Sequence, residues 1–276
     1  MSERRNRAAP VGLVSAFLRR DFRLETSYRL AFVASLGGAF ITLLSAGFLS
    51  RIVPGHQPSL RPYGSDYFTF ALIGTATLSY FSVALGTFAA NMSQEQQLGT
   101  LEALLVTPTD PRAILLCGAT WPFLFGTVQL VIYILVGAVL FHAKIALDHL
   151  ALAGAMLLLT LVAFSAVGLV AASAMILTKR VGPLLGFAGS AFALLGGVLY
   201  PISVLPRSLQ LLAQAFPMVH GLDGVRLALV QDPDLAAIGR DALVLVAFTV
   251  VLVPIALQVF RLAIQHARRT GSLSHY

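Results

Sequence analysis

Six blocks of uncharged, apolar sequence limit what this chain of 276 residues can fold into. Each block is about 20 residues or longer, the length that an α-helix needs to cross about 30 Å of hydrocarbon. None of the blocks contains Asp, Glu, Lys, Arg or His. Apolar residues make up 57% of the chain and charged residues only 11%, compared with about 25% charged residues in a soluble domain. The sequence therefore predicts an all-α, polytopic membrane protein and excludes an ordinary soluble enzyme.

Hydropathy and charged boundaries place six predicted transmembrane helices, and the arginines orient them. The spans cover residues 30–49, 67–90, 113–141, 150–178, 181–200 and 242–260. With the N-terminus inside, most of the 19 Lys and Arg residues fall in the inner segments, as the positive-inside rule requires. We therefore expect both termini in the cytoplasm. The predicted divisions are an N-terminal segment 1–29, a transmembrane domain 30–260 and a tail 261–276.

The N-terminal segment combines arginines with scattered apolar residues. Arginines also begin cleaved export signals, but the apolar block that follows has full span length and no clear small-residue cleavage site precedes a polar domain. We predict instead an amphipathic helix on the inner membrane surface, with apolar side chains toward the acyl chains and arginines toward the lipid phosphates. The residues concerned are Val14, Phe17, Leu18 and Leu24 on the apolar face, and Arg19, Arg20 and Arg23 on the basic face.

The inner connection, residues 91–112, is too long for a simple turn. Ser93 and Gln96 stand at capping-box spacing, which predicts that a new helix starts there. Gly99 indicates a break, Thr100 is a candidate cap for a second helical piece, and prolines end that piece. We therefore expect a rigid, two-part helical projection into the cytoplasm.

The outer connection, residues 201–241, contains two helix-length stretches separated by prolines, at 207–216 and 220–230. Both are too short to cross a bilayer, so they predict a re-entrant hairpin or cap at the outer leaflet. The expected apolar face of the first stretch consists of Leu209, Leu212, Ala213 and Phe216.

Several function classes find little support in the residues. The uncharged spans lack the ionisable groups with which ion-coupled transporters bind protons, although backbone carbonyls of a broken helix leave a sodium-coupled transporter as an alternative. No phosphate-binding loop, paired catalytic carboxylates or nucleophile elbow is present, and the scattered histidines and single Cys117 form no metal pattern. The net charge of +7 comes from arginines beside the spans, which argues against nucleic-acid binding.

The inner connection resembles the signature of the ABC type-2 permeases, the membrane subunits of ATP-binding-cassette exporters. Residues 95–108 read EQQLGTLEALLVTP and lie between the second and third of six spans, as in that family. The stretch GGVLYPISVLP at 196–206, followed by Phe216, Pro217 and the Gly-Val-Arg of 224–226, is similar to the family's segment after span five. The similarity covers roughly residues 10–265.

The resemblance implies a permease without enzymatic activity or cofactor of its own. ATP and Mg would be bound by two copies of a separate ATPase, and a second copy of the permease or a paralogue would complete the pathway. The implied cargo is a hydrophobic or amphipathic compound, drug-like, lipid or glycan, exported across a bacterial inner membrane. A membrane scaffold without an ATPase is the alternative from another class. The implied ATPase-coupling residues are Glu95, Gly99, Thr100, Leu101, Glu102, Leu105 and Pro108, with Glu95 and Glu102 as ion-pair partners for basic residues of the N-terminal helix or the ATPase.

Small residues form two stripes at helical spacing, which allow helices to approach closely. We expect these stripes to line the pathway or to form a dimer seam, although ordinary helix packing explains them equally well. In the second span the stripe consists of Thr75, Ser79, Ser82 and Gly86, and in the fifth of Gly182, Gly186, Gly189, Ala193 and Gly196.

Overall fold

The computed structural model describes residues 10–27, 29–52, 58–64, 66–97, 111–143, 145–178 and 182–270. Within these ranges the chain forms helices and no strands. The long helices are α1 (Pro10–Ser27), α2 (Arg29–Ile52), α3 (Tyr67–Gln97), α5 (Pro111–Phe141), α6 (Leu150–Thr178), α7 (Gly182–Leu195) and α10 (Leu235–Thr270). Short helices η1 (Pro58–Tyr63), η2 (Ile202–Val204), α8 (Arg207–Gln214) and α9 (Pro217–Ala228) lie between them.

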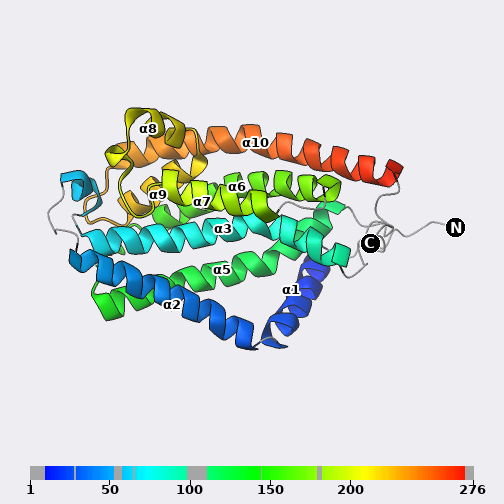
Figure 1. Cartoon of the computed structure of the whole chain (residues 1–276), viewed down its shortest axis with the longest axis horizontal. Helices are drawn as coiled ribbons and strands as arrows, with labels where there is room; N and C mark the ends of the chain where they lie inside the picture. Colours follow the sequence, from blue (N-terminus) through cyan, green and yellow to red (C-terminus); the bar gives the residue numbers. More distant parts are fainter. Residues whose placement is uncertain are drawn as a thin grey trace.

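The helices form an elongated bundle with two different ends (Figure 1). Helices α3, α5, α6, α7 and α10 run along its length, and α2 lies obliquely beside α3 and α5. Helix α1 crosses the bundle at one end, here called the α1 end. Helices η1, α8 and α9 gather at the opposite end, here called the cap end.

Four helices are long and apolar enough to cross a membrane, at Tyr67–Glu95, Ile114–Phe141, Leu150–Ile176 and Leu235–His266. They coincide with the second, third, fourth and sixth predicted spans, which confirms an all-helical membrane protein. Among the residues described, the shorter apolar segment Phe40–Ile52 overlaps the first predicted span and extends beyond its end at 49, and Leu185–Leu195 lies within the fifth.

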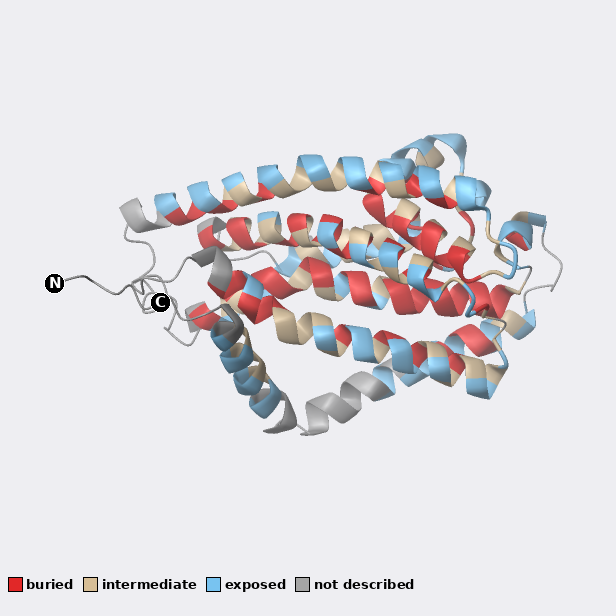
Figure 2. Ribbon diagram, turned by 180° about the vertical axis from the view of Figure 1, so that it is seen from behind, coloured by how far each residue is buried: buried red, intermediate tan, exposed pale blue. Residues whose placement is uncertain are grey.

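Helix α3 lies at the centre of the bundle. Its most apolar window is 78% buried, whereas those of α5 and α10 are 22% and 17% buried. Figure 2 shows the same contrast, with buried positions all along α3 and exposed ones on the outer faces of α5 and α10. The stacked rings of Phe81 and Phe164 join α3 to α6, with their centroids 5.2 Å apart. The apolar outer faces of α5 and α10 suit contact with lipid.

Helix α3 continues without interruption past Ser93 to Gln97, so the helix start predicted at Ser93 is wrong. A new start there would leave up to four backbone N–H groups without helical partners, whereas continuation keeps them bonded to the preceding turn. Met92 and Glu95 are buried on this extension, which gives it packing partners as well. The predicted break at Gly99 and the second helical piece lie outside the described residues.

Helices α8 and α9 form at the two stretches predicted for the outer hairpin. The predicted apolar face of α8 is only partly covered, since Ala213 is buried while Leu212 is exposed. Asp234 accepts hydrogen bonds from the backbone N–H groups of Ala236 and Ala237 and so caps α10. Because α10 begins at Leu235, the hairpin ends earlier than the predicted boundary at 241.

Two glycines let α9 pack closely against α6. A Cβ on Gly221 would lie 2.1 Å from the Thr160 hydroxyl oxygen, and one on Gly224 would lie 2.1 Å from Met156 Cε. Helix α9 also contacts α10, and nine of its residues are buried. The second stretch of the hairpin is therefore part of the bundle core rather than a loose lid.

Candidate functional site

The predicted ATPase-coupling segment is described only at its beginning. Glu95 lies on the last turns of α3 and is 9% exposed. The other predicted coupling residues lie outside the described ranges, namely Gly99, Thr100, Leu101, Glu102, Leu105 and Pro108. Their coupling role stays a prediction.

Glu95 joins α3 to α1 through an ion pair. The guanidinium of Arg20 donates from Nη1 to Glu95 Oε1 over 3.1 Å and from Nε to Asp21 Oδ1 over 2.8 Å. It also lies 4.7 Å from the ring centroid of Phe17. An ion pair between Glu95 and the N-terminal helix is therefore present, and Arg20 points to this carboxylate rather than to the lipid phosphates predicted for it.

Aromatic rings continue the junction between α1 and α5. The ring of Phe22 meets Trp121 edge-on at a centroid distance of 5.5 Å, and Trp121 stacks with Phe125 at 6.2 Å. Gly118 leaves room between the helices, because a Cβ there would lie 3.0 Å from Asn91 Nδ2 and 3.8 Å from the Phe17 ring. Helix α1 is thus attached to both α3 and α5 at the end of the bundle where segment 98–110 leaves α3.

The small residues of α3 and α7 are placed differently along their stripes. On α3, Thr75 is buried and its hydroxyl donates to Ala71 O of the same helix. Ser79 and Ser82 are exposed. Among the described residues, nothing lies within 4 Å of a Cβ placed on Gly86. On α7, nothing among the described residues lies within 4 Å of a Cβ placed on Gly182, Gly186 or Gly189, and Ala193 is half-buried. Gly196, just after α7, is buried against Phe192 O and Met218. Both stripes therefore contain buried and uncovered positions, and their role in a pathway or dimer seam stays a prediction.

A buried arginine organises the cap end. Arg226 on α9 is 2% exposed, and its guanidinium donates from Nη1 to Gly197 O over 2.8 Å. Its Nη2 donates to Val198 O over 2.6 Å and to Phe70 O over 3.0 Å. The guanidinium carbon lies 3.4 Å from the centroid of the Phe70 ring, a cation–π contact. One side chain therefore joins α9, the turn after α7 and the first turn of α3.

Two glycines make room for this arginine. A Cβ on Gly74 would lie 2.2 Å from Val198 O and 2.3 Å from Arg226 Nη2, distances that no side chain tolerates. Gly197 has a φ of +68°, the left-handed conformation that glycine adopts readily when a helix ends. Gly74 therefore lets the turn after α7 approach α3, and Gly197 lets the chain form that turn.

Asp223 and Tyr63 complete the surroundings of Arg226. The Tyr63 hydroxyl donates to Asp223 Oδ1 over 3.1 Å, which ties η1 to α9. Burial raises the pKa of Asp223, while the positive charge of Arg226 opposes that rise. Burial lowers the pKa of Arg226 to about 10, so the guanidinium is still a cation at neutral pH. These groups lie on short segments between the long helices.

His220 forms a second polar link, between α9, α8 and α10. Its Nδ1 lies 2.9 Å from Asp241 Oδ1, and its Nε2 lies 3.0 Å from the carbonyl oxygen of Gln214. A carbonyl oxygen only accepts hydrogen bonds and so does an ionised carboxylate, so both ring nitrogens carry protons if Asp241 is ionised. The hydrogen bond to Asp241 raises the pKa of His220, in agreement with a cationic imidazolium. Among the residues that the structure describes, no three His, Cys, Asp or Glu side chains are grouped to hold a metal ion.

Comparison with known proteins identifies the chain. The model of a family described as ABC-2 type transporter matches residues 13–230, which run from α1 through α9. The chain belongs to the ABC-2 type transporter family. No match was found among curated proteins. As an ABC-2 family member, the chain is a transmembrane permease component of an ABC transporter, and permeases of this family generally pair with an ABC ATPase.

The polar links at the cap end of this ABC-2 permease were not predicted as functional residues. Arg226 was noted only as one of the outer arginines and as part of the Gly-Val-Arg stretch that resembles the family, and His220 only as one of the scattered histidines. The sequence also offered a second signal, because Asp223 and Arg226 stand three residues apart on a predicted helix and so share a face. The partners on α3, the turn after α7 and α10 are too distant in sequence to be paired without a fold.

Proposed function

We propose that this chain is the membrane subunit of an ABC exporter in a bacterial inner membrane, with six spans and both termini in the cytoplasm. Two copies of a separate ATPase would bind ATP and Mg and act on the α1 end. A second copy of the chain, or a paralogue, would complete the pathway. The proposed cargo is a hydrophobic or amphipathic compound, drug-like, lipid or glycan, because the spans offer mainly apolar and weakly polar side chains.

The observation that carries the proposal is the junction of α1, α3 and α5 around Arg20 and Glu95. It holds the N-terminal helix against the base of α3, directly before the segment that resembles the family's coupling region. A displacement of that segment by an ATPase would therefore act on three helices together. Membership of the ABC-2 family supplies the kind of partner, an ABC ATPase.

Helix lengths support a six-span arrangement. Helix α2 has 24 residues, or about 36 Å at 1.5 Å per residue, enough for a hydrocarbon core of about 30 Å. Helix α7 has 14 residues, or about 21 Å, and needs the turn that follows it to complete a crossing. Irregular backbone is tolerated at membrane depth where protein buries it, and Gly196, Gly197 and Val198 are buried.

Purification from the native host in mild detergent tests the proposal. We expect the tagged chain to bring an ABC ATPase with it and the complex to hydrolyse ATP in a vanadate-sensitive manner. Glu102→Arg should remove the ATPase or uncouple it while the spans remain folded. Asp232→Arg, which changes an exposed carboxylate near the cap end, is the matched control and should leave the complex intact.

Other outcomes favour the alternatives. A chain purified without any ATPase would support a membrane scaffold. Transport that stops when the proton or sodium gradient is collapsed, while ATP is still present, would support an ion-coupled transporter. Normal cargo-dependent ATP hydrolysis by Glu102→Arg would count against the docking role of the inner connection.

A further inference from the structure

We propose that Arg226 is a positioning residue for transport, which fixes the outer end of α7 as a stationary hinge while the rest of α7 moves. The inference rests on the proposed function, since it concerns how a permease span rearranges during transport. It is argued from how α7 is held at its two ends.

The turn that follows α7 presents carbonyl groups that belong to no helix. This turn lies at the C-terminal end of α7, which carries the negative end of the helix dipole. Here the chain turns sharply at Gly197, and the carbonyls of Gly197 and Val198 are directed at the Arg226 guanidinium. A buried cation is thus placed where both the unpaired acceptors and the dipole favour positive charge.

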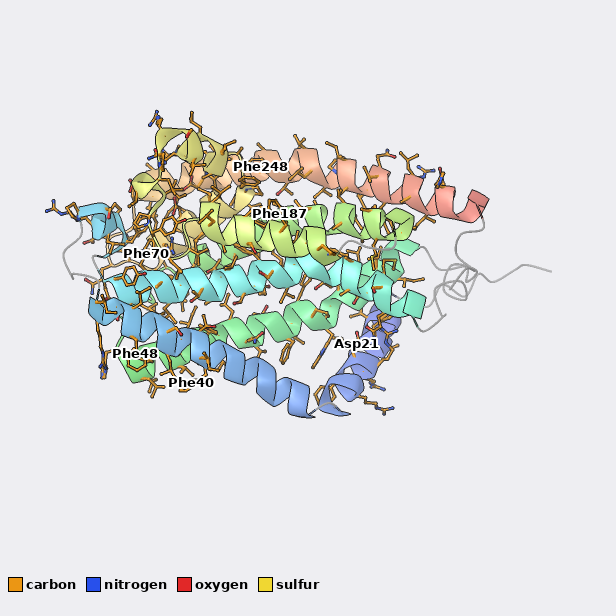
Figure 3. The ribbon with its side chains drawn as sticks, in the orientation of Figure 1. Asp21, Phe40, Phe48, Phe70, Phe187 and Phe248 are labelled. Atoms are coloured by element: carbon orange, nitrogen blue, oxygen red, sulfur yellow. The ribbon has the colours of Figure 1, made fainter. Side chains whose placement is uncertain are left out.

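The same guanidinium binds the first turn of α3. It accepts no hydrogen bonds, and its planar fork of donors suits several fixed acceptors at once, which a lysine ammonium does not reproduce. One arm reaches Phe70 O, and the face of the guanidinium lies on the Phe70 ring. Figure 3 places Phe70 at the cap end of α3, away from Asp21 at the α1 end. Because α3 is the most buried of the four long apolar helices, the turn after α7 is attached to the interior of the bundle.

The other half of α7 is held differently. Among the described residues, nothing lies within 4 Å of a Cβ placed on Gly182, Gly186 or Gly189, and Phe187 is 74% exposed. One apolar face of this half packs on the core through Leu185 and Ala188. The rings nearest the turn are packed, because Phe192 meets Phe164 of α6 at 5.3 Å and Phe216 at 5.4 Å. Ring contacts and the hydrogen bonds of Arg226 therefore hold the outer end of α7, whereas one apolar face holds its inner half.

A stationary hinge fits this arrangement better than a gate that opens at Arg226. Opening there would leave a buried cation and three carbonyl oxygens without partners, and stranded buried charges are among the most costly defects in a protein. Rotation of α7 about its outer end breaks none of these bonds. It moves the inner half of α7, where the glycines have open space on one side and Leu185 and Ala188 contact the core through apolar side chains on the other.

Distance measurements between spin labels test the hinge. Labels are attached in a Cys117→Ser background, because Cys117 is the single cysteine of the chain. The outer pair is Leu199→Cys with Leu235→Cys, and the inner pair is Phe187→Cys with Leu262→Cys, all at exposed positions. The complex is purified from the native host, diluted with unlabelled chain to suppress distances between copies, and placed in nanodiscs. Double electron–electron resonance is recorded without nucleotide and after trapping with ATP and vanadate.

With Arg226 present, we expect the outer distance to stay unchanged on trapping and the inner distance to shift by several ångströms. Arg226→Lys keeps the charge but loses the planar set of guanidinium donors. The distribution of the outer distance should therefore broaden without nucleotide, and the change in the inner distance on trapping should become smaller. Arg240→Lys, at an exposed arginine of α10, is the matched control and should behave like the unchanged chain. If Arg226→Lys does not fold, the trapping comparison with Arg226 present still decides between hinge and gate.

An outer distance that shifts on trapping while the inner one stays fixed would overturn the hinge, and so would a sharp outer distance in Arg226→Lys. ATP hydrolysis measured on the same sample separates this result from the proposed function. Absence of vanadate-sensitive hydrolysis would count against the ABC exporter. In either case, the outer distance of Arg226→Lys without nucleotide tests whether Arg226 holds the outer end of α7. Hydrolysis without any shift of the inner pair would leave the exporter standing and remove the hinge.

Discussion

Arg20 and Glu95 are separated by most of two helices in the sequence, yet their side chains meet at 3.1 Å where α1 crosses the base of α3. The arginine is about half exposed and the carboxylate is largely covered. Such a pair contributes about 0.3–1 kcal/mol to stability, so its value lies in orienting α1 rather than in holding the fold.

We expect Glu95→Arg to lower the coupling between ATP hydrolysis and transport, because α1 loses its orientation, and to lower the melting temperature, because the new arginine would be largely buried and would face Arg20. The double variant Arg20→Glu with Glu95→Arg restores an ion pair and should recover much of the coupling. Transport per ATP hydrolysed in proteoliposomes is the measurement. A double variant no better than Glu95→Arg would show that the ion pair is not what matters.

Gly74→Ala should destabilise the protein by about 1–3 kcal/mol, the range for overpacking a close contact. The added methyl would meet Val198 O and Arg226 Nη2, and neither is the free end of a flexible chain. Gly86→Ala on the same helix is the control, since nothing lies within 4 Å and helix propensity favours alanine by about 1 kcal/mol. Thermal unfolding in detergent compares the two, and equal effects would contradict the close approach described here.

His220 should make stability depend on pH. Its pKa in the folded protein is raised by the hydrogen bond to Asp241, so the link stabilises the fold fully below the ordinary histidine pKa of about 6.5. The contribution is lost as the pH rises through the raised pKa. His220→Gln should therefore lower the melting temperature clearly at about pH 5.5 and much less at about pH 9. His149→Gln is the control, and a loss that is the same at both pH values would contradict an ionised pair.

Trp121, the single tryptophan of the chain, offers a built-in probe of the α1 junction. Its ring packs between Phe22 of α1 and Phe125 of α5. Phe22→Ala should expose the indole and shift its emission to longer wavelength, whereas Phe187→Ala, far along α7, should not. Unchanged emission in Phe22→Ala would mean that α1 does not cover Trp121 in the membrane.

The long spans could be predicted from sequence because their signal is local. An uncharged block such as 150–178 excludes every alternative to a buried or membrane helix, and α6 follows it closely. Helices α8 and α9 could be predicted because prolines separate the two stretches that form them. The end of α3 was mispredicted, because a capping box at Ser93 and a continuing helix use similar residues, and only the burial of Met92 and Glu95 decides between them.

The polar links could not be predicted, because each depends on distant positions being side by side. Arg226 can lie in the core because Gly74 leaves space for its guanidinium and Gly197 O accepts a hydrogen bond from it. These three positions lie on three different elements. A single sequence shows such an arginine as one charge on a short predicted helix, without its partners. The predicted small-residue stripes are visible as patterns, but whether they face a partner, a pathway or lipid depends on surfaces outside one chain.

Helix α3 runs without a break from Phe70, whose carbonyl accepts from Arg226, to Glu95, which pairs with Arg20. The distance is about 38 Å at 1.5 Å per residue. It contains no proline, so it has no kink of that origin between these two contacts. The guanidinium of Arg226 and that of Arg20, at opposite ends of the bundle, are therefore bonded to one continuous helix, and its length sets the spacing between them.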